Sequence, residues 1–334
     1  MEKYFQSQNL KDYITDVPGV KVGHSQDLQG GTGCTVVIFE KGAVTGVEVR
    51  GGAPGTRETA LLNPVNLVEK AHSIYLSGGS AFGLDGATGV MKYLEEREIG
   101  FDVGLTKVPI VPAAVLFDLG VADFRVRPDA QMGYNACLNA SYREDRQGNI
   151  GAGTGATVGK VRGGAYCMKS GIGSTSFRRG ELVIGAIVAV NCFGDVVDPQ
   201  SGEIIAGALD DDKKRFVNTI SYLQDTNLSK NGVEQFPENT TIGAIATNAK
   251  LTKAGATKVA MMAHNGFARA IIPVHTMFDG DTIFCSGTGE VEAEVNVVGI
   301  LAAELMVQAI LNAVKNAESM YGIPAYRDLL NPAK

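Results

Sequence analysis

The chain has 334 residues and a formal net charge of -6 at pH 7. Hydrophobic residues make up 45% and charged residues 20%, proportions that are typical of a globular protein and unlike those of a disordered one. No apolar run reaches the roughly 20 residues of a membrane span, and no basic stripe is present to neutralise phosphates, so we expect neither a membrane nor a nucleic-acid partner. The start of the chain lacks the apolar region of a signal peptide, which favours a cytoplasmic location.

Short β-branched runs and helical periodicities alternate along the chain. Runs bounded by Gly, Pro, Asn or Asp predict strands over residues 20–22, 34–39, 43–50, 73–76, 181–191 and 241–247. Apolar residues at helical spacing predict helices over 80–96, 252–270 and 295–319. This mixture predicts a layered α/β or α+β body.

Residues 208–238 are a long polar connection, with a possible helix over 213–223. Connections of this length in a compact domain tend to be functional or disordered, so we expect a surface or mobile segment.

Two glycine-rich segments do not match the known sequence motifs to which they are most similar. Residues 151–161 (GAGTGATVGKV) have Thr154 where a phosphate-binding loop needs its first glycine, and Val161 follows Lys160 where serine or threonine is needed. The same stretch lacks the strand, helix and acidic residue of a dinucleotide fingerprint. In residues 78–83 (GGSAFG), Phe82 replaces the glycine of a nucleophile elbow around Ser80, so Gly78 and Gly79 are better interpreted as packing a turn or approaching a ligand.

The histidines and cysteines show no metal-binding spacing. The four histidines are scattered and are interpreted as structural, although a Ser-His-Asp site cannot be judged from spacing: His24, His72, His264 and His275. The five cysteines form no C-x-x-C pair, and we expect most of them to be small buried core residues.

Thr240 is the strongest candidate for chemistry. It follows a polar, turn-prone segment and opens an apolar run, so hydrolysis of the Asn239–Thr240 bond would leave a hydroxyl nucleophile and an α-amino base on one residue. The alternative is an ordinary turn residue that opens a strand. Downstream, Asp279 and Asp281 flank Gly280; they are either a hairpin turn or two carboxylates that orient the hydroxyl and the α-ammonium group.

Five ordered motifs resemble the DmpA-type N-terminal-nucleophile peptidases, which include D-aminopeptidases, β-peptidyl aminopeptidases and nylon-oligomer hydrolases. The resemblance extends over nearly the whole chain, and its landmarks are residues 14–24 (ITDVPGVKVGH), 50–58 (RGGAPGTRE), 76–84 (LSGGSAFGL), 151–160 (GAGTGATVGK) and 239–242 (NTTI).

The resemblance implies one self-processing domain over residues 1–334 with a four-layer α-β-β-α sandwich fold. It also implies cleavage into an α subunit, residues 1–239, and a β subunit, residues 240–334. Homotetramers are implied as the assembly, and no metal or organic cofactor is needed.

The resemblance also assigns roles to residues. Thr240 is implied as the nucleophile and Asn191 as an oxyanion-hole donor, with Asp279 and Asp281 as the orienting pair and Lys160 as a further active-site residue. We expect the walls of the substrate pocket to include the following residues: Gly78, Gly79, Ser80, Phe117 and Tyr134.

The chain departs from part of the family. Some relatives place a tyrosine where Phe117 stands, and many have a serine nucleophile and a Ser-x-Glu pair, so this chain is more similar to the nylon-oligomer branch. Aspartates that relatives carry near Ala60 and Asn63 are absent.

The predicted function is therefore a self-cleaving amidohydrolase or aminopeptidase that acts on small peptides or peptide-like amides. Two alternatives remain: an acyltransferase of the ornithine-acetyltransferase kind, and a binding protein that is never processed. The sequence leaves open whether the substrate contains D-residues, β-residues, α-residues or ω-amino acids.

Overall fold

The computed structural model describes residues 12–225 and 239–330. In this part of the chain, nine strands form one mixed sheet in the order β10-β11-β14-β16-β2-β4-β7-β3, with β1 also paired to β2. The strands of this sheet are β1 (Val20–Asp27), β2 (Thr32–Val49), β3 (Gly55–Arg57), β4 (Lys70–Ser77), β7 (Ala113–Val115), β10 (Ile172–Arg179), β11 (Leu182–Asn191), β14 (Thr240–Ala249) and β16 (Thr282–Val291).

Shorter strands and the helices complete the described residues. The short strands are β5 (Phe101–Asp102), β6 (Lys107–Val108), β8 (Thr157–Val158), β9 (Met168–Lys169), β12 (Asp195–Val197), β13 (Ile204–Ala206) and β15 (Ile271–Ile272). The helices are α1 (Gly86–Glu95), α2 (Ala130–Leu138), α3 (Thr219–Asp225), α4 (Lys253–Ala270), α5 (Val295–Lys315) and α6 (Tyr326–Leu330).

The long strand β2 joins the two halves of the sheet. Its first half pairs with β1 and β4, and its last residues pair with β16. The pairing with β4 shifts register between Ile38 and Ala43. A strand this long can belong to both halves, so the sheet folds over on itself while its hydrogen bonding stays continuous through β2.

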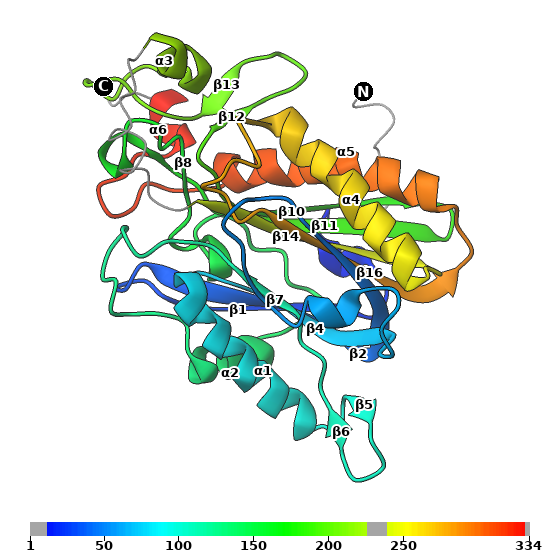
Figure 1. Cartoon of the computed structure of the whole chain (residues 1–334). Coiled ribbons are helices and arrows are strands. Elements are labelled where there is room, and N and C mark those ends of the chain that lie inside the picture. The colour runs from blue at the N-terminus through cyan, green and yellow to red at the C-terminus, as the bar shows by residue number, and fades with distance from the viewer. Residues whose placement is uncertain (1–11, 226–238, 331–334) are drawn as a thin grey trace.

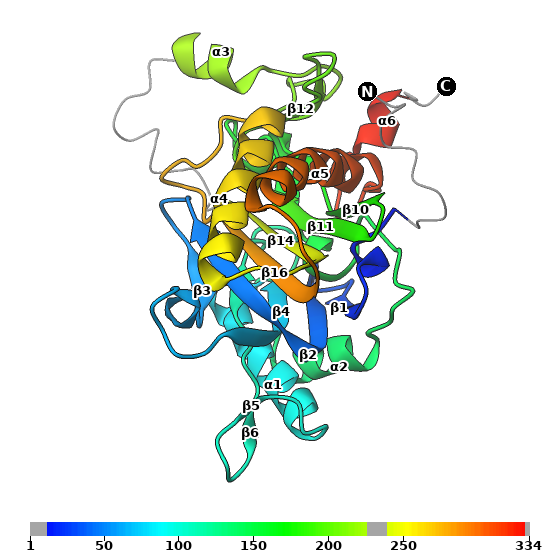
Figure 2. The same ribbon diagram turned by 90° about the vertical axis from the view of Figure 1, so that its right-hand side faces the viewer.

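Three hydrophobic cores separate four layers in the described residues. One core lies between α4 and α5 and the half that contains β10, β11, β14 and β16; a second lies between the two halves; a third lies between β2, β4 and the pair α1 and α2. Neighbouring residues of one strand alternate between cores, as Val188 and Ala189 do on β11. Helices cover both outer faces in Figures 1 and 2, which confirms the predicted α-β-β-α sandwich.

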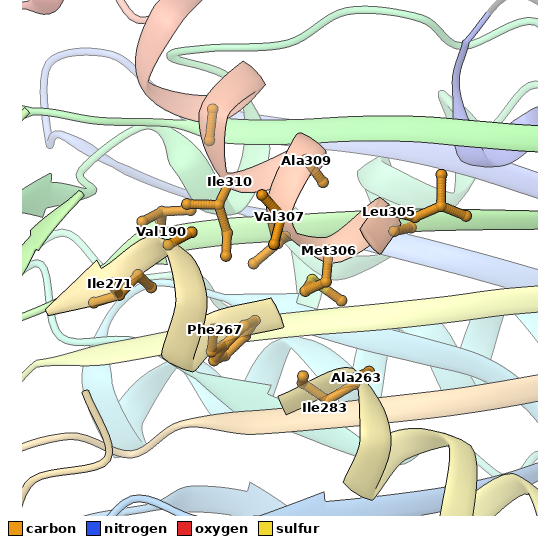
Figure 3. Packing of buried hydrophobic residues seen from close by; sticks show 14 of the residues in the cluster. Val190, Ala263, Phe267, Ile271, Ile283, Leu305, Met306, Val307, Ala309 and Ile310 are labelled. Carbon is orange, nitrogen blue, oxygen red and sulfur yellow. The ribbon is translucent and has the colours of Figure 1, made fainter. Parts of the chain in front are cut away.

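Helices α4 and α5 pack closely on the sheet. Figure 3 shows Phe267 of α4 and Met306 and Ile310 of α5 in one cluster with Val190 and Ile283 of the strands. Small residues permit this approach: a Cβ atom at Gly46 of β2 would lie 2.2 Å from the backbone nitrogen of Thr257.

Helix α5 is long and apolar enough to cross a membrane by length and composition alone, but 67% of its most apolar window is buried inside the protein. It packs against α4, β10 and β11, as a core helix does.

Several predicted elements differ from the structure. The predicted strands 34–39 and 43–50 are parts of one strand, β2, which ends at residue 49. The predicted helix 80–96 begins as a 3-10 helix, Ser80–Asp85, before α1. Residues 279–281 do not form a hairpin turn, because the strand before them, β15, pairs with β12, whereas β16 after them pairs with β14 and β2. The predicted helix within 213–223 is α3, Thr219–Asp225, and residues 226–238 lie outside the described part of the chain.

Candidate active site

Thr240 is the first residue of β14 and is only 4% exposed. Its direct partner in the antiparallel ladder is Asn191, the last residue of β11. Side chains of directly paired residues lie on the same face of a sheet, so this register brings together two residues that are far apart in sequence.

The Thr240 hydroxyl contacts the peptide bond that precedes it. Its Oγ1 donates a hydrogen bond to the carbonyl oxygen of Asn239. The backbone N–H of Gly280 approaches both atoms, at 2.9 Å from the Asn239 oxygen and 3.1 Å from Thr240 Oγ1. A Cβ atom at Gly280 would lie 2.7 Å from Oγ1, so only glycine leaves room for the hydroxyl here.

Asn191 is held in one orientation by its neighbours. Its Oδ1 accepts hydrogen bonds from the backbone nitrogen of Thr157 at 3.0 Å and from Lys160 Nζ at 2.8 Å. Because both partners are donors there, the opposite atom is the amide nitrogen, and Nδ2 donates to the Phe117 carbonyl at 2.9 Å. An amide nitrogen carries two protons, so the second proton on Asn191 Nδ2 remains for a further acceptor.

Lys160 is buried beside the Asn191 amide. Its Nζ also donates to the backbone oxygen of Asn191 at 3.2 Å. Burial lowers the pKa of Lys160 to about 8, an effect that the negative charge of Asp279 partly opposes.

The two carboxylates hold backbone around Thr240, and neither bonds its hydroxyl. Asp279 Oδ2 accepts hydrogen bonds from the backbone nitrogen and Oγ1 of Thr276, at 2.9 and 2.6 Å. Asp281 Oδ1 accepts one from the backbone nitrogen of Thr241 at 2.8 Å. Burial, and then the negative charge of Asp281, raise the pKa of Asp279.

A cavity of about 280 Å³ opens at Thr240. Its lining is uncharged, and consists of Ala53, Pro54, Gly55, Ser80, Ala81, Val115, Leu116, Phe117 and Thr240. Of the five predicted pocket residues, Ser80 and Phe117 line this cavity together with Thr240.

Gly78 and Gly79 directly precede Ser80 in the chain but do not line the cavity themselves. Asp118 accepts a hydrogen bond from the backbone nitrogen of Gly79 at 2.7 Å, and a Cβ atom at Gly78 would collide with the same carboxylate. Burial raises the pKa of Asp118 to about 6.

Tyr134 does not line the cavity, contrary to the prediction. It lies on α2 in the outer helical layer, where its hydroxyl donates to Glu96 at 2.7 Å. The sequence around it carries no signal of this, because helix packing decides which residues reach the site.

Sequence reasoning missed two groups at the site. The backbone N–H of Gly280 has no side-chain signature, although its place between two aspartates marks a turn. The sequence predicts a structural role for His275, and in the structure its ring contacts Asp281. No histidine bonds a serine in the described residues: the four rings contact Tyr13 and Thr35, the Ile110 nitrogen, the Glu48 carbonyl and Asp281.

Within residues 12–225 and 239–330, no group of three or more His, Cys, Asp or Glu side chains is placed to hold a metal ion. The groups that surround Thr240 are instead a lysine, an amide, two carboxylates and backbone N–H groups.

Comparisons with known proteins show which protein family this chain belongs to. The family model described as Peptidase family S58 matches residues 12–326. An uncharacterized aminopeptidase of Mycobacterium tuberculosis is 40% identical over 345 residues, which cover 95% of this chain and 97% of that protein. A 6-aminohexanoate-oligomer endohydrolase of Kocuria sp. is 32% identical over 318 residues, which cover 90% of this chain and 85% of that protein.

The fold has solved counterparts. The L-aminopeptidase D-Ala-esterase/amidase from Ochrobactrum anthropi, described as a variant of the Ntn hydrolase fold, matches with a TM-score of 0.70 at 17% sequence identity. The match covers 95% of this chain and 90% of that one. Because the family model spans nearly the whole chain and the relatives align along most of their length, the chain belongs to peptidase family S58, the DmpA family of peptide-bond hydrolases.

Proposed function

We propose that the chain cleaves itself between Asn239 and Thr240, and that Thr240 then hydrolyses amide bonds of small peptides or peptide-like amides. The observation that supports this most directly is the contact of Thr240 Oγ1 with the Asn239 carbonyl, with the Gly280 N–H on both oxygens, at the wall of a cavity.

Self-cleavage begins when Thr240 Oγ attacks the carbonyl carbon of Asn239. The Gly280 N–H faces the oxygen on which negative charge develops. Collapse of this adduct breaks the bond between the Asn239 carbon and the Thr240 nitrogen, which takes up the hydroxyl proton. Water then hydrolyses the resulting ester and leaves Thr240 with a free α-amine.

In the mature site the α-amine is the base. Its reference pKa of roughly 7.7 to 8.0 lets it take the hydroxyl proton near neutral pH and pass it to the leaving amine. The acyl group is then bound to Thr240 as an ester, and a water molecule activated by the same amine releases it. The free Nδ2 proton of Asn191 is available for the oxyanion of both steps.

The relatives suggest two kinds of substrate. One is named an aminopeptidase and another a 6-aminohexanoate-oligomer endohydrolase. The uncharged lining of the cavity suits an acyl group without charge next to the scissile bond. Four probes cover the range: a D-alanyl amide, a β-alanyl dipeptide, an L-alanyl dipeptide and a 6-aminohexanoate trimer, each followed by release of amine.

The test compares Thr240→Ala with Thr241→Val. The Thr241 hydroxyl is buried and has no hydrogen-bond partner within residues 12–225 and 239–330, and valine keeps its shape and the backbone N–H that Asp281 binds. We expect the wild type and Thr241→Val to yield two fragments in denaturing mass spectrometry and to hydrolyse at least one probe. Thr240→Ala should stay a single 35.1 kDa chain without activity.

An uncleaved wild-type chain that still hydrolyses a probe would disprove the self-cleavage. A cleaved chain that only transfers acyl groups to an amine acceptor would show an acyltransferase instead, and an uncleaved, inactive chain would favour a binding protein.

A further inference from the structure

His275 lies directly behind the Asp281 carboxylate. Its Nδ1 is 2.8 Å from Asp281 Oδ2, and its backbone nitrogen donates to the same oxygen at 3.1 Å. The other carboxylate oxygen, Oδ1, accepts the hydrogen bond from the Thr241 backbone nitrogen. The Asp281 side chain is fully buried, so these three bonds determine its position.

The chemistry of the pair fixes where the histidine carries a proton. An ionised carboxylate only accepts hydrogen bonds, so Nδ1 must be a donor. The Nε2 atom of the same ring is buried and has no hydrogen-bond partner among the described residues. A proton there would be a buried donor without an acceptor, which favours a neutral ring protonated at Nδ1.

The groups around the His275 ring are consistent with a neutral ring protonated at Nδ1. His264 makes an edge contact with His275 at a centroid distance of 4.8 Å, and Phe267 stacks on it at 6.1 Å. Burial lowers the pKa of His264 to about 3, so that neighbour carries no charge near neutral pH. Its Nε2 contacts the Glu48 carbonyl and not His275.

We propose that His275 is a positioning residue that holds Asp281 against the peptide group between Thr240 and Thr241. The contacts run from His275 Nδ1 through the two oxygens of Asp281 to the Thr241 N–H, and this peptide group fixes the backbone that carries the nucleophile. The inference rests on the proposed role of Thr240.

The backbone of His275 guides the choice of variants. Its φ of 58° lies in the left-handed region, which asparagine tolerates better than most residues. In His275→Asn the amide nitrogen can take the place of Nδ1 and keep the donor to Asp281. In His275→Gln the amide lies further out, near the position of Nε2, and this donor is lost.

The main measurement is self-cleavage of freshly synthesised chain, which needs no added substrate, together with kcat and KM for the four probes. Loss of a hydrogen bond to a charged group predicts that His275→Gln slows self-cleavage and lowers kcat on the order of 10- to 100-fold, with KM nearly unchanged. His275→Asn should restore both rates to within about threefold of the wild type, since its donor is kept.

His24 supplies a matched control. It is buried, whereas the His275 side chain is 17% exposed, and its Nδ1 makes a contact of the same 2.8 Å length, but to the neutral hydroxyl of Thr35. His24→Asn should lower the thermal stability without changing either rate. A purely structural role for His275 would instead make the His275 variants behave like His24→Asn.

The tautomer gives a readout that does not depend on any variant folding. Nitrogen-15 NMR of histidine-labelled wild-type protein near neutral pH should show one ring protonated at Nδ1 and not at Nε2. A His275 ring protonated only at Nε2 would overturn the proposal, as would His275→Gln with wild-type rates. If Thr240→Ala remains active, the proposed function fails; if Thr240→Ala is inactive while His275→Gln is normal, only the role of His275 fails.

Discussion

Buried charged groups set the electrostatics around Thr240. Lys160 is 4% exposed and contacts the Asn191 amide oxygen, while the buried Asp279 and Asp281 flank Gly280, whose N–H contacts Thr240. A cation on Oδ1 draws electron density from the amide and makes Nδ2–H a better donor. The charge of Lys160 therefore affects the proposed oxyanion site at Asn191 Nδ2, although Lys160 makes no hydrogen bond with Thr240 among the described residues.

This contact predicts an alkaline fall in activity. Because burial lowers the pKa of Lys160 to about 8, its ammonium group loses a proton as the pH rises through that value. Between about pH 6 and about pH 10, kcat/KM should first rise as the Thr240 α-amine, with a reference pKa of roughly 7.7 to 8.0, loses its proton, and then fall as Lys160 loses its own proton. Lys160→Met should be slow and should keep the rise but not the alkaline fall. Persistence of the fall in Lys160→Met would assign it to another group.

Deprotonation of Lys160 affects stability in the opposite direction to activity. Between about pH 8 and the usual value of 10.5, the unfolded chain holds a proton on Lys160 that the folded chain has lost. The free energy of unfolding from this group therefore rises with pH in that window. Loss of activity there cannot be a result of unfolding at Lys160, so the two effects are separable in one pH series.

At the scale of elements, close contact between strand β2 and helix α4 builds the outer layer behind the site. Glycine at position 46 allows the backbone of Thr257 to touch the sheet. The helix begins with the side chain of Thr252 accepting a hydrogen bond from the Gly255 nitrogen at 3.0 Å, which satisfies one of the free N–H groups of its first turn.

A methyl group at this contact should destabilise the fold. Gly46→Ala places a Cβ atom 2.2 Å from a backbone nitrogen, so helix and strand must separate, and we expect a loss of about 1 to 3 kcal/mol in the free energy of unfolding. Urea unfolding of Thr240→Ala chains, which remain in one piece, measures this loss.

Gly120→Ala is the control for this experiment. Nothing lies within 4 Å of a Cβ atom at Gly120, so we expect a change within about 0.5 kcal/mol. Equal effects of both substitutions would show that the α4 contact can relax freely.

At the scale of the whole molecule, the proposed cleavage does not divide the protein into separable bodies. Strand β14 lies between β11 and β16 in the sheet, and residues on both sides of the cut share the cores. Separation of residues 1–239 from 240–334 would expose the faces of β11 and β2 together with the apolar faces of α4 and α5.

We therefore expect the two fragments to remain together after cleavage. They should elute as one species in size-exclusion chromatography and native mass spectrometry, with the mass of the intact chain plus one water per protomer, and separate only in denaturant. Free fragments under native conditions would contradict the continuous core. The same native mass tests our proposal that the protomers form a homotetramer.

The periodicity of the sequence predicts much of the scaffold. The predicted helix over 252–270 matches α4 to within one residue, and the predicted strands over 181–191 and 241–247 match β11 and β14 closely. These elements are long and have a strong hydrophobic pattern, so the local spacing of apolar residues is enough to predict them. Strand β2 was split in two because the polar residues Glu40 and Lys41 interrupt its apolar run, although the backbone pairs on both sides of them.

The sequence by itself determined the family, the four-layer fold that the family implies, and Thr240 as the candidate nucleophile, because these depend on local motifs. Only the tertiary structure decided which residues face Thr240. The ladder register places Asn191 opposite it, the turn before β16 aims the Gly280 N–H at it, and the ring of His275 supports Asp281. Tyr134 is excluded in the same way, by the packing of α2 in the outer layer. Such contacts arise from strand register and layer packing between distant segments, which no local pattern encodes.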